Sequence, residues 1–144
     1  MTSWDVVVVG VGAVGSFALR AAARRGARAL GLELESPAHA RGSSHGHCRI
    51  FRHAYFEHPD YVPLLRHATR RFEELERERA TSLLHRCGVL LLGRSDSTIL
   101  ARSLDAARAH GLTVDDLDAR DVARRFPWFA SPLAERGVFE PDAG

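Results

Sequence analysis

A glycine-rich turn between a run of valines and an alanine-rich segment constrains the fold of this chain more than any other feature. Residues 6–9 are four valines, residues 10–15 read GVGAVG, and a helix is expected from there to about Arg25. Residues 30–33 read LGLE and predict a second strand. The order strand, glycine turn, helix and strand predicts a Rossmann-like, dinucleotide-binding βαβ unit of an α/β fold.

Each glycine of this turn has a separate physical task. Gly10 permits the tight turn out of the strand, and Gly12 lets the backbone approach a pyrophosphate because it carries no Cβ atom. Gly15 lets the helix pack closely against the strand. The helix N-terminus then presents N–H groups and the positive end of the helix dipole to the phosphates.

Glu33 ends the second strand, 18 residues after Gly15. At this distance a carboxylate accepts hydrogen bonds from ribose hydroxyl groups. It would repel a 2′-phosphate, which disfavours NADP. FAD and NAD both carry an adenosine with a free 2′-hydroxyl, so the glycine motif by itself leaves both open.

Composition narrows the class of protein. The chain has 144 residues, 45% of them hydrophobic, which suits a folded domain with a core, and its net charge of +2 gives no reason to expect a nucleic-acid partner. No apolar run approaches the length of a membrane span, no signal peptide is visible and only two cysteines occur, so a cytoplasmic location is expected. All 20 basic residues are arginine, so the chain offers no lysine for a Schiff base or general base.

Beyond residue 58 the strand–helix alternation of the first unit lapses. The hydrophobic periodicity predicts a helix over 59–80 with Asp60 as its N-cap, and helices over 95–110 and 118–126. Strands are expected at 88–93, 113–117 and 137–140, as pieces of another sheet. We therefore expect a βαβ unit with its cofactor loop at 1–58 and the start of a substrate domain at 59–144, together forming the front part of a larger protein. The apolar face of the 59–80 helix is predicted to hold Tyr61, Leu64, Leu65, Ala68, Phe72 and Leu75.

The loop between residues 36 and 55 contains a second group of residues with possible binding or catalytic roles. Three interpretations of this loop compete. A metal site could use His45, His47, Cys48 and His53, but these residues lack a recognised zinc spacing, so no metal is expected. A polar surface loop with incidental histidines is the interpretation that fits the remaining ones, which are His39, His58, His67, His85 and His110. In a cofactor loop, Gly42, Ser43 and Ser44 would offer donors to a phosphate, and Arg49 and Arg52 would face an anion.

The chain resembles the N-terminal part of the monomeric sarcosine oxidase and N-methyltryptophan oxidase family of FAD-dependent amine oxidases. The resemblance runs along the whole chain and is most specific at residues 42–55. Further matching segments are residues 5–15, Glu33, 61–64, 88–90 and 139–144. It favours FAD over NAD, which the glycine motif does not decide.

The resemblance implies a role for each matching residue. The cofactor site would comprise Gly10, Gly12, Ala13, Val14, Gly15, Glu33, Ser43, Ser44 and Arg49. His45 and Arg49 would lie near the isoalloxazine ring as catalytic residues, and Arg52 would bind the carboxylate of an N-methyl amino acid. The family oxidises the C–N bond of an amine, passes the electrons to the flavin and returns them to O2 as hydrogen peroxide.

The chain also departs from the family. His47-Cys48 replaces the usual Asp-Thr pair, and the family's flavin-linking cysteine and O2-activating lysine would lie outside these residues. We therefore expect this chain alone to be incomplete and inactive. Two alternatives remain: a non-catalytic nucleotide-binding fragment or relic, and an NAD-dependent dehydrogenase, which does not explain residues 42–55.

Overall fold

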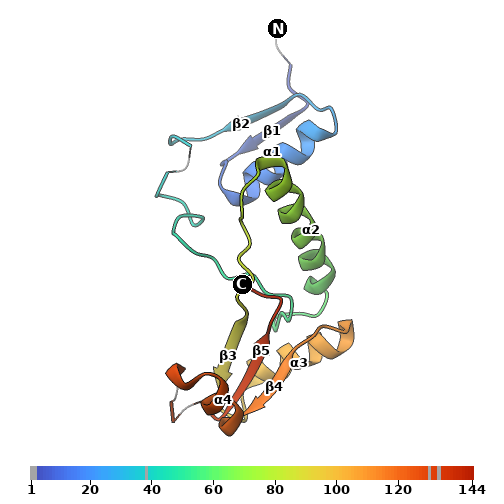
Figure 1. The fold of residues 1–144 in the computed structure, drawn as a ribbon. Helices are drawn as coiled ribbons and strands as arrows, with labels where there is room; N and C mark the ends of the chain where they lie inside the picture. The colour runs from blue at the N-terminus through green and yellow to red at the C-terminus, as the bar shows by residue number, and fades with distance from the viewer. Residues whose placement is uncertain (1–2, 38, 130, 133) are drawn as a thin grey trace. The chain divides into compact units, whose positions relative to one another are not determined.

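The computed structural model describes residues 3–37, 39–129, 131–132 and 134–144 (Figure 1). It divides into two compact units, residues 1–49 and residues 50–144. Residues 50–58, which the sequence analysis groups with the cofactor loop, thus belong with the second unit by their contacts. Each unit is described by itself below.

The first unit contains the βαβ arrangement that the glycine turn predicts. Strand β1 (Val6–Val9) is followed by helix α1 (Ala13–Arg24) and strand β2 (Ala29–Leu32). The two strands pair in parallel, with Val6 opposite Ala29 and Val9 opposite Leu32. Asp5 accepts hydrogen bonds from the Arg28 guanidinium and from its backbone N–H, which ties the start of β1 to the start of β2.

The small sheet of the first unit is covered on one face only. Helix α1 packs along both strands (Figure 1), and close packing is possible because Gly31 has no side chain to meet Leu19. On the other face Val7 and Val9 are 50% and 82% exposed. None of the described residues up to Arg49 is buried, because two strands and one helix offer too little surface to enclose a core.

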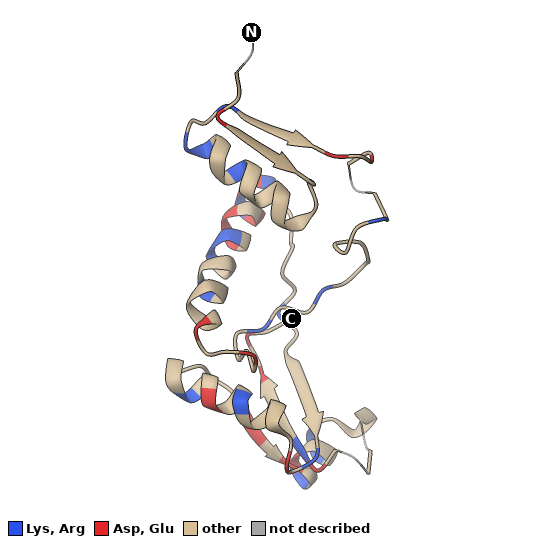
Figure 2. Ribbon diagram, turned by 180° about the vertical axis from the view of Figure 1, so that it is seen from behind, with Lys and Arg blue, Asp and Glu red and all other residues tan. Residues whose placement is uncertain are grey.

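Helix α2 (Tyr61–Arg79) begins the regular structure of the second unit. Its charged second half alternates basic and acidic residues along its length (Figure 2). The predicted apolar face was partly wrong: Tyr61 and Leu64 are exposed, whereas Val62 is fully buried and shares its face with Thr69 and Phe72. Spacing alone did not decide between neighbouring helical faces that both carry apolar residues.

The helix starts of the second unit differ in how they are capped. Asp60 occupies the N-cap of α2, as predicted, but its side chain forms no capping hydrogen bond because its backbone is itself helical. At α3 (Thr98–His110) the hydroxyl of Ser97 accepts from the Leu100 N–H. At α4 (Ala119–Arg125) the carboxylate of Asp118 accepts from the Asp121 N–H at 2.8 Å.

A three-stranded antiparallel sheet organises the rest of the second unit. Its strands are β3 (Val89–Gly93), β4 (Asp115–Asp118) and β5 (Arg136–Glu140), in the order β3-β5-β4. A short 3₁₀ helix, η1 (Pro127–Phe129), follows α4. The expectation that the later strands form another sheet is confirmed.

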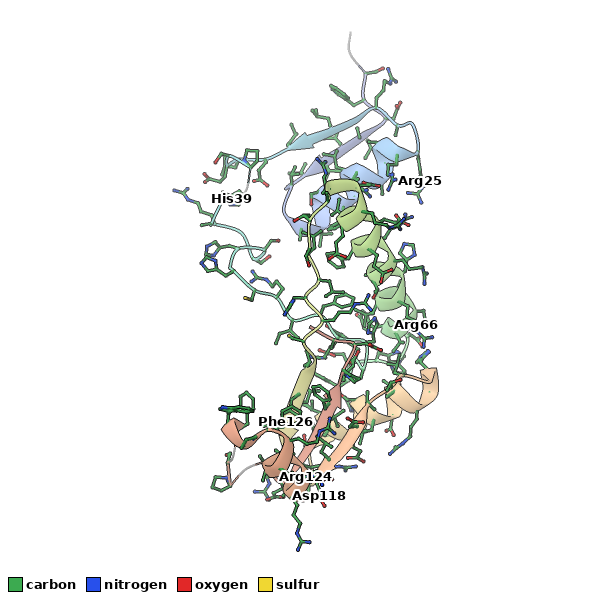
Figure 3. The ribbon with its side chains drawn as sticks, viewed as in Figure 1. Arg25, His39, Arg66, Asp118, Arg124 and Phe126 are labelled. Carbon is green, nitrogen blue, oxygen red and sulfur yellow. The ribbon has the colours of Figure 1, made fainter. Side chains whose placement is uncertain are left out.

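Helices cover both faces of this sheet, because successive strand residues point to opposite sides. On one face, Val138 packs with Leu100 and Leu104 of α3. On the other, Phe139 and Phe126 pack beside the buried Leu117 and Val122, with their ring centroids 5.2 Å apart (Figure 3). Among the described residues, no helix is both long and apolar enough to cross a membrane.

Candidate functional site

The glycine turn owes its shape to contacts that a side chain would prevent. Gly10 has φ of 85°, in the left-handed region that favours glycine. A Cβ atom on Gly15 would lie 1.8 Å from the carbonyl oxygen of Gly10, so the helix and the turn touch backbone to backbone. A Cβ atom on Gly12 would meet Ser44 Oγ at an ordinary 3.4 Å. Gly15 is therefore required by the fold, whereas Gly12 is not.

The N-terminus of α1 lies against the loop that follows β2. Gly12 is the N-cap and has no side chain with which to cap the helix. Instead, Ser44 Oγ accepts a hydrogen bond from the Ala13 N–H at 3.0 Å. A hydroxyl 31 residues away thus satisfies one of the helix-end donors that the sequence analysis assigns to a phosphate.

Glu33 lies directly after β2 and contacts the same turn. Its Oε2 accepts from the Val11 N–H at 2.7 Å and its Oε1 from the Leu34 N–H at 2.8 Å. These hydrogen bonds hold the pKa of Glu33 below its usual value, and the bond from Val11 contributes most to the shift. The carboxylate is therefore ionised at neutral pH. His39, labelled in Figure 3, belongs to the loop after β2. Its Nε2 lies 3.8 Å from Glu33 Oε1.

These groups surround one cavity within the first unit, with a volume of about 1430 Å³. It exceeds the range of about 300–1,000 Å³ typical of small-molecule pockets, and so has room for a dinucleotide. The proposed site residues that line it are Gly12, Ala13, Glu33, Ser43, Ser44 and His45. Four of the proposed site residues do not line it: Gly10, Val14, Gly15 and Arg49. Of these, Gly10 and Gly15 shape the turn instead.

The cavity wall also contains residues that the motif did not predict. His39, which the sequence analysis interprets as structural or exposed, lines it together with Arg41, whose guanidinium pairs with Glu35 at 2.6 Å. No spacing rule connects these residues to the glycine turn. Their place on the wall follows from the course of the loop.

Arg49 is used within its own loop. Its guanidinium donates to the backbone carbonyls of Ser43, at 3.0 Å, of Cys48, at 2.6 Å, and of His45. Residues 43–48 are thereby gathered around one cation. The arrangement gives Arg49 a loop-holding contact in addition to the flavin role that the resemblance implies.

Arg52 belongs to the second unit. Its guanidinium lies over the rings of Tyr55 and Phe56, at 4.9 Å and 4.7 Å, and its Nη2 is 3.5 Å from Glu57 Oε2. Within the described part of the chain, the buried Arg52 Nε has no hydrogen-bond partner. The side chain is thus a cation held by aromatic rings with one donor still unused.

A buried polar cluster in the second unit was missed by the sequence analysis. Glu140, 4% exposed, accepts from the N–H groups of His53 and Ala54 and contacts His53 Nδ1 at 2.8 Å. Burial raises the pKa of Glu140, but the hydrogen bonds from His53 and Ala54 outweigh it, so the net shift is downward. In the sequence, this cluster was signalled by one feature, the charged residue Glu140 at the end of the apolar strand predicted at 137–140.

Metal-ligating residues do not gather in the described part of the chain: no group of three or more His, Cys, Asp or Glu side chains there could hold a metal ion. Cys48 and Cys87 are both exposed free thiols.

A parallel βαβ unit whose glycine turn, acidic residue and loop enclose a dinucleotide-sized cavity defines a dinucleotide-binding α/β protein. Residues 5–144 match the family model described as FAD dependent oxidoreductase. The chain therefore belongs to the FAD-dependent oxidoreductase family, and the preference for FAD over NAD is confirmed by this membership.

Curated relatives carry the names of amine oxidases. The chain is 43% identical over 142 residues to the monomeric sarcosine oxidase of Streptomyces avermitilis, covering 99% of this chain and 37% of the relative. It is 36% identical over 141 residues to the N-methyl-L-tryptophan oxidase of Yersinia pestis, covering 98% and 38%. The chain thus spans little more than a third of these relatives, along the N-terminal part that the resemblance implies.

Solved structures of oxidases share the fold. NikD, an unusual amino acid oxidase essential for nikkomycin biosynthesis, in its open form, has a TM-score of 0.80 at 28% identity over 100% of this chain and 37% of its own. Glycine oxidase from Geobacillus kaustophilus has a TM-score of 0.70 at 23% identity, covering 98% and 40%. At the latter identity the likeness concerns the fold alone.

Proposed function

We propose that residues 1–49 bind the adenosine and pyrophosphate part of FAD and that the chain forms the N-terminal portion of a sarcosine oxidase-like amine oxidase. The observation that carries the proposal is the cavity that the glycine turn, Glu33 and residues 41–47 line together. Glu33 would bind the ribose, and Gly10, Gly12 and Gly15 would shape the turn that receives the pyrophosphate. The Val14 N–H would be a donor, and the Ala13 N–H, which donates to Ser44 Oγ in this structure, would be a second one when that hydroxyl gives way to the phosphate.

The residues present fit this cofactor. Two hydrogen bonds occupy the Glu33 carboxylate, and carboxylate oxygens offer about four acceptor positions, so capacity remains for ribose hydroxyls. Ser43 and Ser44 supply further polar groups on the wall, and no side chain on Gly12 obstructs the helix end. The negative charge on Glu33 would exclude a 2′-phosphate.

The amine oxidase activity is proposed from the relatives and from Arg52. When bound, FAD would accept the electrons from oxidation of an amine C–N bond and pass them to O2, giving hydrogen peroxide. His45 and Arg49 would place positive charge near the flavin ring. We propose an N-methyl amino acid as the substrate, an amine with a carboxylate, and the cytoplasm as the location, where exposed thiols such as Cys48 stay reduced.

Arg52 would bind the substrate carboxylate. Its position over two aromatic rings restricts the orientation of the guanidinium, and the planar fork of donors suits a carboxylate. Lysine at this position would lose both the planar fork and the stacking.

Cofactor binding is tested by titrating the purified chain with FAD and, separately, with NAD and NADP, and following flavin fluorescence or heat of binding. We expect FAD to bind and NADP not to bind. Gly12→Ala should leave the circular dichroism spectrum unchanged but weaken FAD binding at least about tenfold, or about 1.4 kcal/mol, because the new methyl group intrudes on the path of the pyrophosphate. Arg25→Ala, at the exposed far end of α1, is the matched control.

Two outcomes would contradict the proposal. Binding of NAD in preference to FAD would favour the dehydrogenase alternative, and equal FAD affinity of the wild type and Gly12→Ala would remove the turn from the site. Release of peroxide from sarcosine is measured in the same samples. Rapid turnover by these 144 residues alone would overturn the expectation that they are inactive.

A further inference from the structure

The backbone on both sides of Arg52 is tied to one short stretch at the end of the chain. The N–H of Phe51 donates to the Gly144 carbonyl at 2.7 Å, and the N–H of Gly144 donates to the Phe51 carbonyl at 2.9 Å. After Arg52, the N–H groups of His53 and Ala54 donate to the two carboxylate oxygens of Glu140, at 2.7 Å and 2.9 Å. Residues 51–54 form no helix or strand, so these contacts are what fixes their course.

We propose that Glu140 is a positioning residue for Arg52: its buried carboxylate bridges the two amides after Arg52 and sets the direction in which the guanidinium projects. The assignment of Arg52 to a substrate carboxylate rests on the proposed function, whereas the geometry of the bridge does not. Each oxygen of Glu140 is engaged, and the carboxylate is 4% exposed, so the bridge has little competition from water.

The ring of His53 adds a third hydrogen bond to Glu140. Its Nδ1 lies 2.8 Å from Glu140 Oε1, and because an ionised carboxylate only accepts, Nδ1 donates this bond. On the other side of the ring, Nε2 lies 2.8 Å from the Thr69 hydroxyl oxygen, which is 3.0 Å from the Leu65 carbonyl. His53 thus links the carboxylate to helix α2.

These three hydrogen bonds let Glu140 hold the backbone with both of its carboxylate oxygens satisfied in the interior. An unpaired buried carboxylate would be costly and would oppose binding of a second carboxylate at the neighbouring Arg52. Packing supports the arrangement from the side, since the His53 ring contacts Phe51 edge to face at 5.3 Å, and Phe51 contacts Phe72 of α2 at 5.7 Å. The guanidinium of Arg52 itself contacts the rings of Tyr55 and Phe56 and the carboxylate of Glu57.

The test uses the ¹⁵N-labelled 144-residue chain and the Nε–H resonance of Arg52, identified by its absence in Arg52→Lys. In the wild type this resonance should be displaced by the ring currents of Tyr55 and Phe56. In Glu140→Gln, which replaces an acceptor by an NH2 group facing N–H donors, it should move to the position of exposed arginines. Glu140→Asp should restore part of the displacement, and Asp116→Asn, an exposed carboxylate in the same unit, should change nothing.

Two further readouts complete the test. Imidazole ¹⁵N shifts should show His53 Nδ1 protonated, and an unprotonated Nδ1 would overturn its hydrogen bond to Glu140. Sarcosine should shift the Arg52 resonance, and Glu140→Gln should raise the required concentration at least about tenfold. If sarcosine leaves the wild-type resonance unmoved while Glu140→Gln displaces it, these 144 residues alone do not bind sarcosine at Arg52, and the positioning role stands.

An unchanged Arg52 resonance in a folded Glu140→Gln variant would overturn the positioning role. If that variant loses the dispersed core signals of Leu100 and Val138, His53→Gln replaces it, because this change leaves both backbone bonds to Glu140 possible and removes the imidazole ring with its bond to the carboxylate. It should displace the Arg52 resonance by a smaller amount. No displacement in His53→Gln would likewise overturn the inference.

Discussion

The two units of the chain carry their functional groups in opposite ways. In residues 1–49 the proposed ligand contacts come from backbone N–H groups, a hydroxyl and an ionised carboxylate around an open cavity, with no buried residue among those described. In residues 50–144 two apolar clusters lie on the two faces of a three-stranded sheet, and the polar residues His53 and Glu140 are buried. The first unit is built around a cavity, whereas the second is built around a core.

This difference has a thermodynamic consequence. Burial of apolar surface is the main favourable term in folding, and the first unit buries little. A ligand that binds only its folded form adds about 2.7 kcal/mol at a concentration of 100 times its dissociation constant. We therefore expect FAD to stabilise residues 1–49 far more than residues 50–144. Peptide-resolved hydrogen exchange, which reports on both units in one sample, measures this directly.

The largest effect is expected from Gly15→Ala. The new methyl carbon would lie 1.8 Å from the Gly10 carbonyl oxygen, so the helix and the turn cannot both keep their places. Hydrogen exchange should show that residues 6–32 lose protection and FAD binding disappears, while residues 89–140 keep theirs. Gly12→Ala, with its ordinary 3.4 Å contact, is the control for protection and should leave hydrogen exchange of residues 6–32 unchanged, although it weakens FAD binding. If residues 89–140 lost protection as well, the expectation that the first unit unfolds without the second would be wrong.

The converse change is Leu100→Ala in the core of the second unit. Leu100 is 1% exposed and packs with Leu104 and Val138, so the cavity should cost about 2–5 kcal/mol. Urea unfolding followed by hydrogen exchange should place the loss in residues 50–144. FAD affinity should stay unchanged, because residues 11–47 line the cavity. A matching fall in FAD affinity would show that the two units are coupled.

A smaller effect distinguishes two of the helix N-caps of the second unit, Ser97 of α3 and Asp60 of α2. Ser97→Ala removes the hydroxyl that accepts from the Leu100 N–H and should cost about 1 kcal/mol. Asp60→Ala removes a side chain that makes no capping bond and should cost clearly less. Thermal unfolding measures both. Equal losses would mean that Asp60 caps α2 in solution after all.

The smallest effect is the acid response of Glu33. Hydrogen bonds from Val11 and Leu34 lower the pKa of Glu33 in the folded unit, so its stabilising contribution is complete above the usual glutamate pKa of about 4.3. The contribution is lost as the pH falls through the lower folded value. The Val11 amide shift should report this titration, and Glu33→Gln should abolish it. A midpoint at or above the usual value would contradict the hydrogen-bonded geometry.

Local patterns predicted the elements well where one physical rule dominated. The valine run, the glycine turn and Glu33 specified the βαβ unit, and the helix predicted over 95–110 ends at His110 as expected, followed by Gly111 with φ of 59°. Predictions were weaker where neighbouring residues offered equivalent choices. On α2 the buried face contains Val62 rather than Tyr61, because the choice depends on what the helix packs against.

The sequence by itself determined the dinucleotide turn, the acidic residue that follows it and the resemblance to FAD-dependent oxidases, because these depend on residue types at short spacings. Only the tertiary structure decided which distant groups meet. Ser44 reaches the start of α1 across 31 residues, and Glu140 reaches His53 across 87. Such contacts depend on how loops close and strands pair, and no local periodicity encodes them.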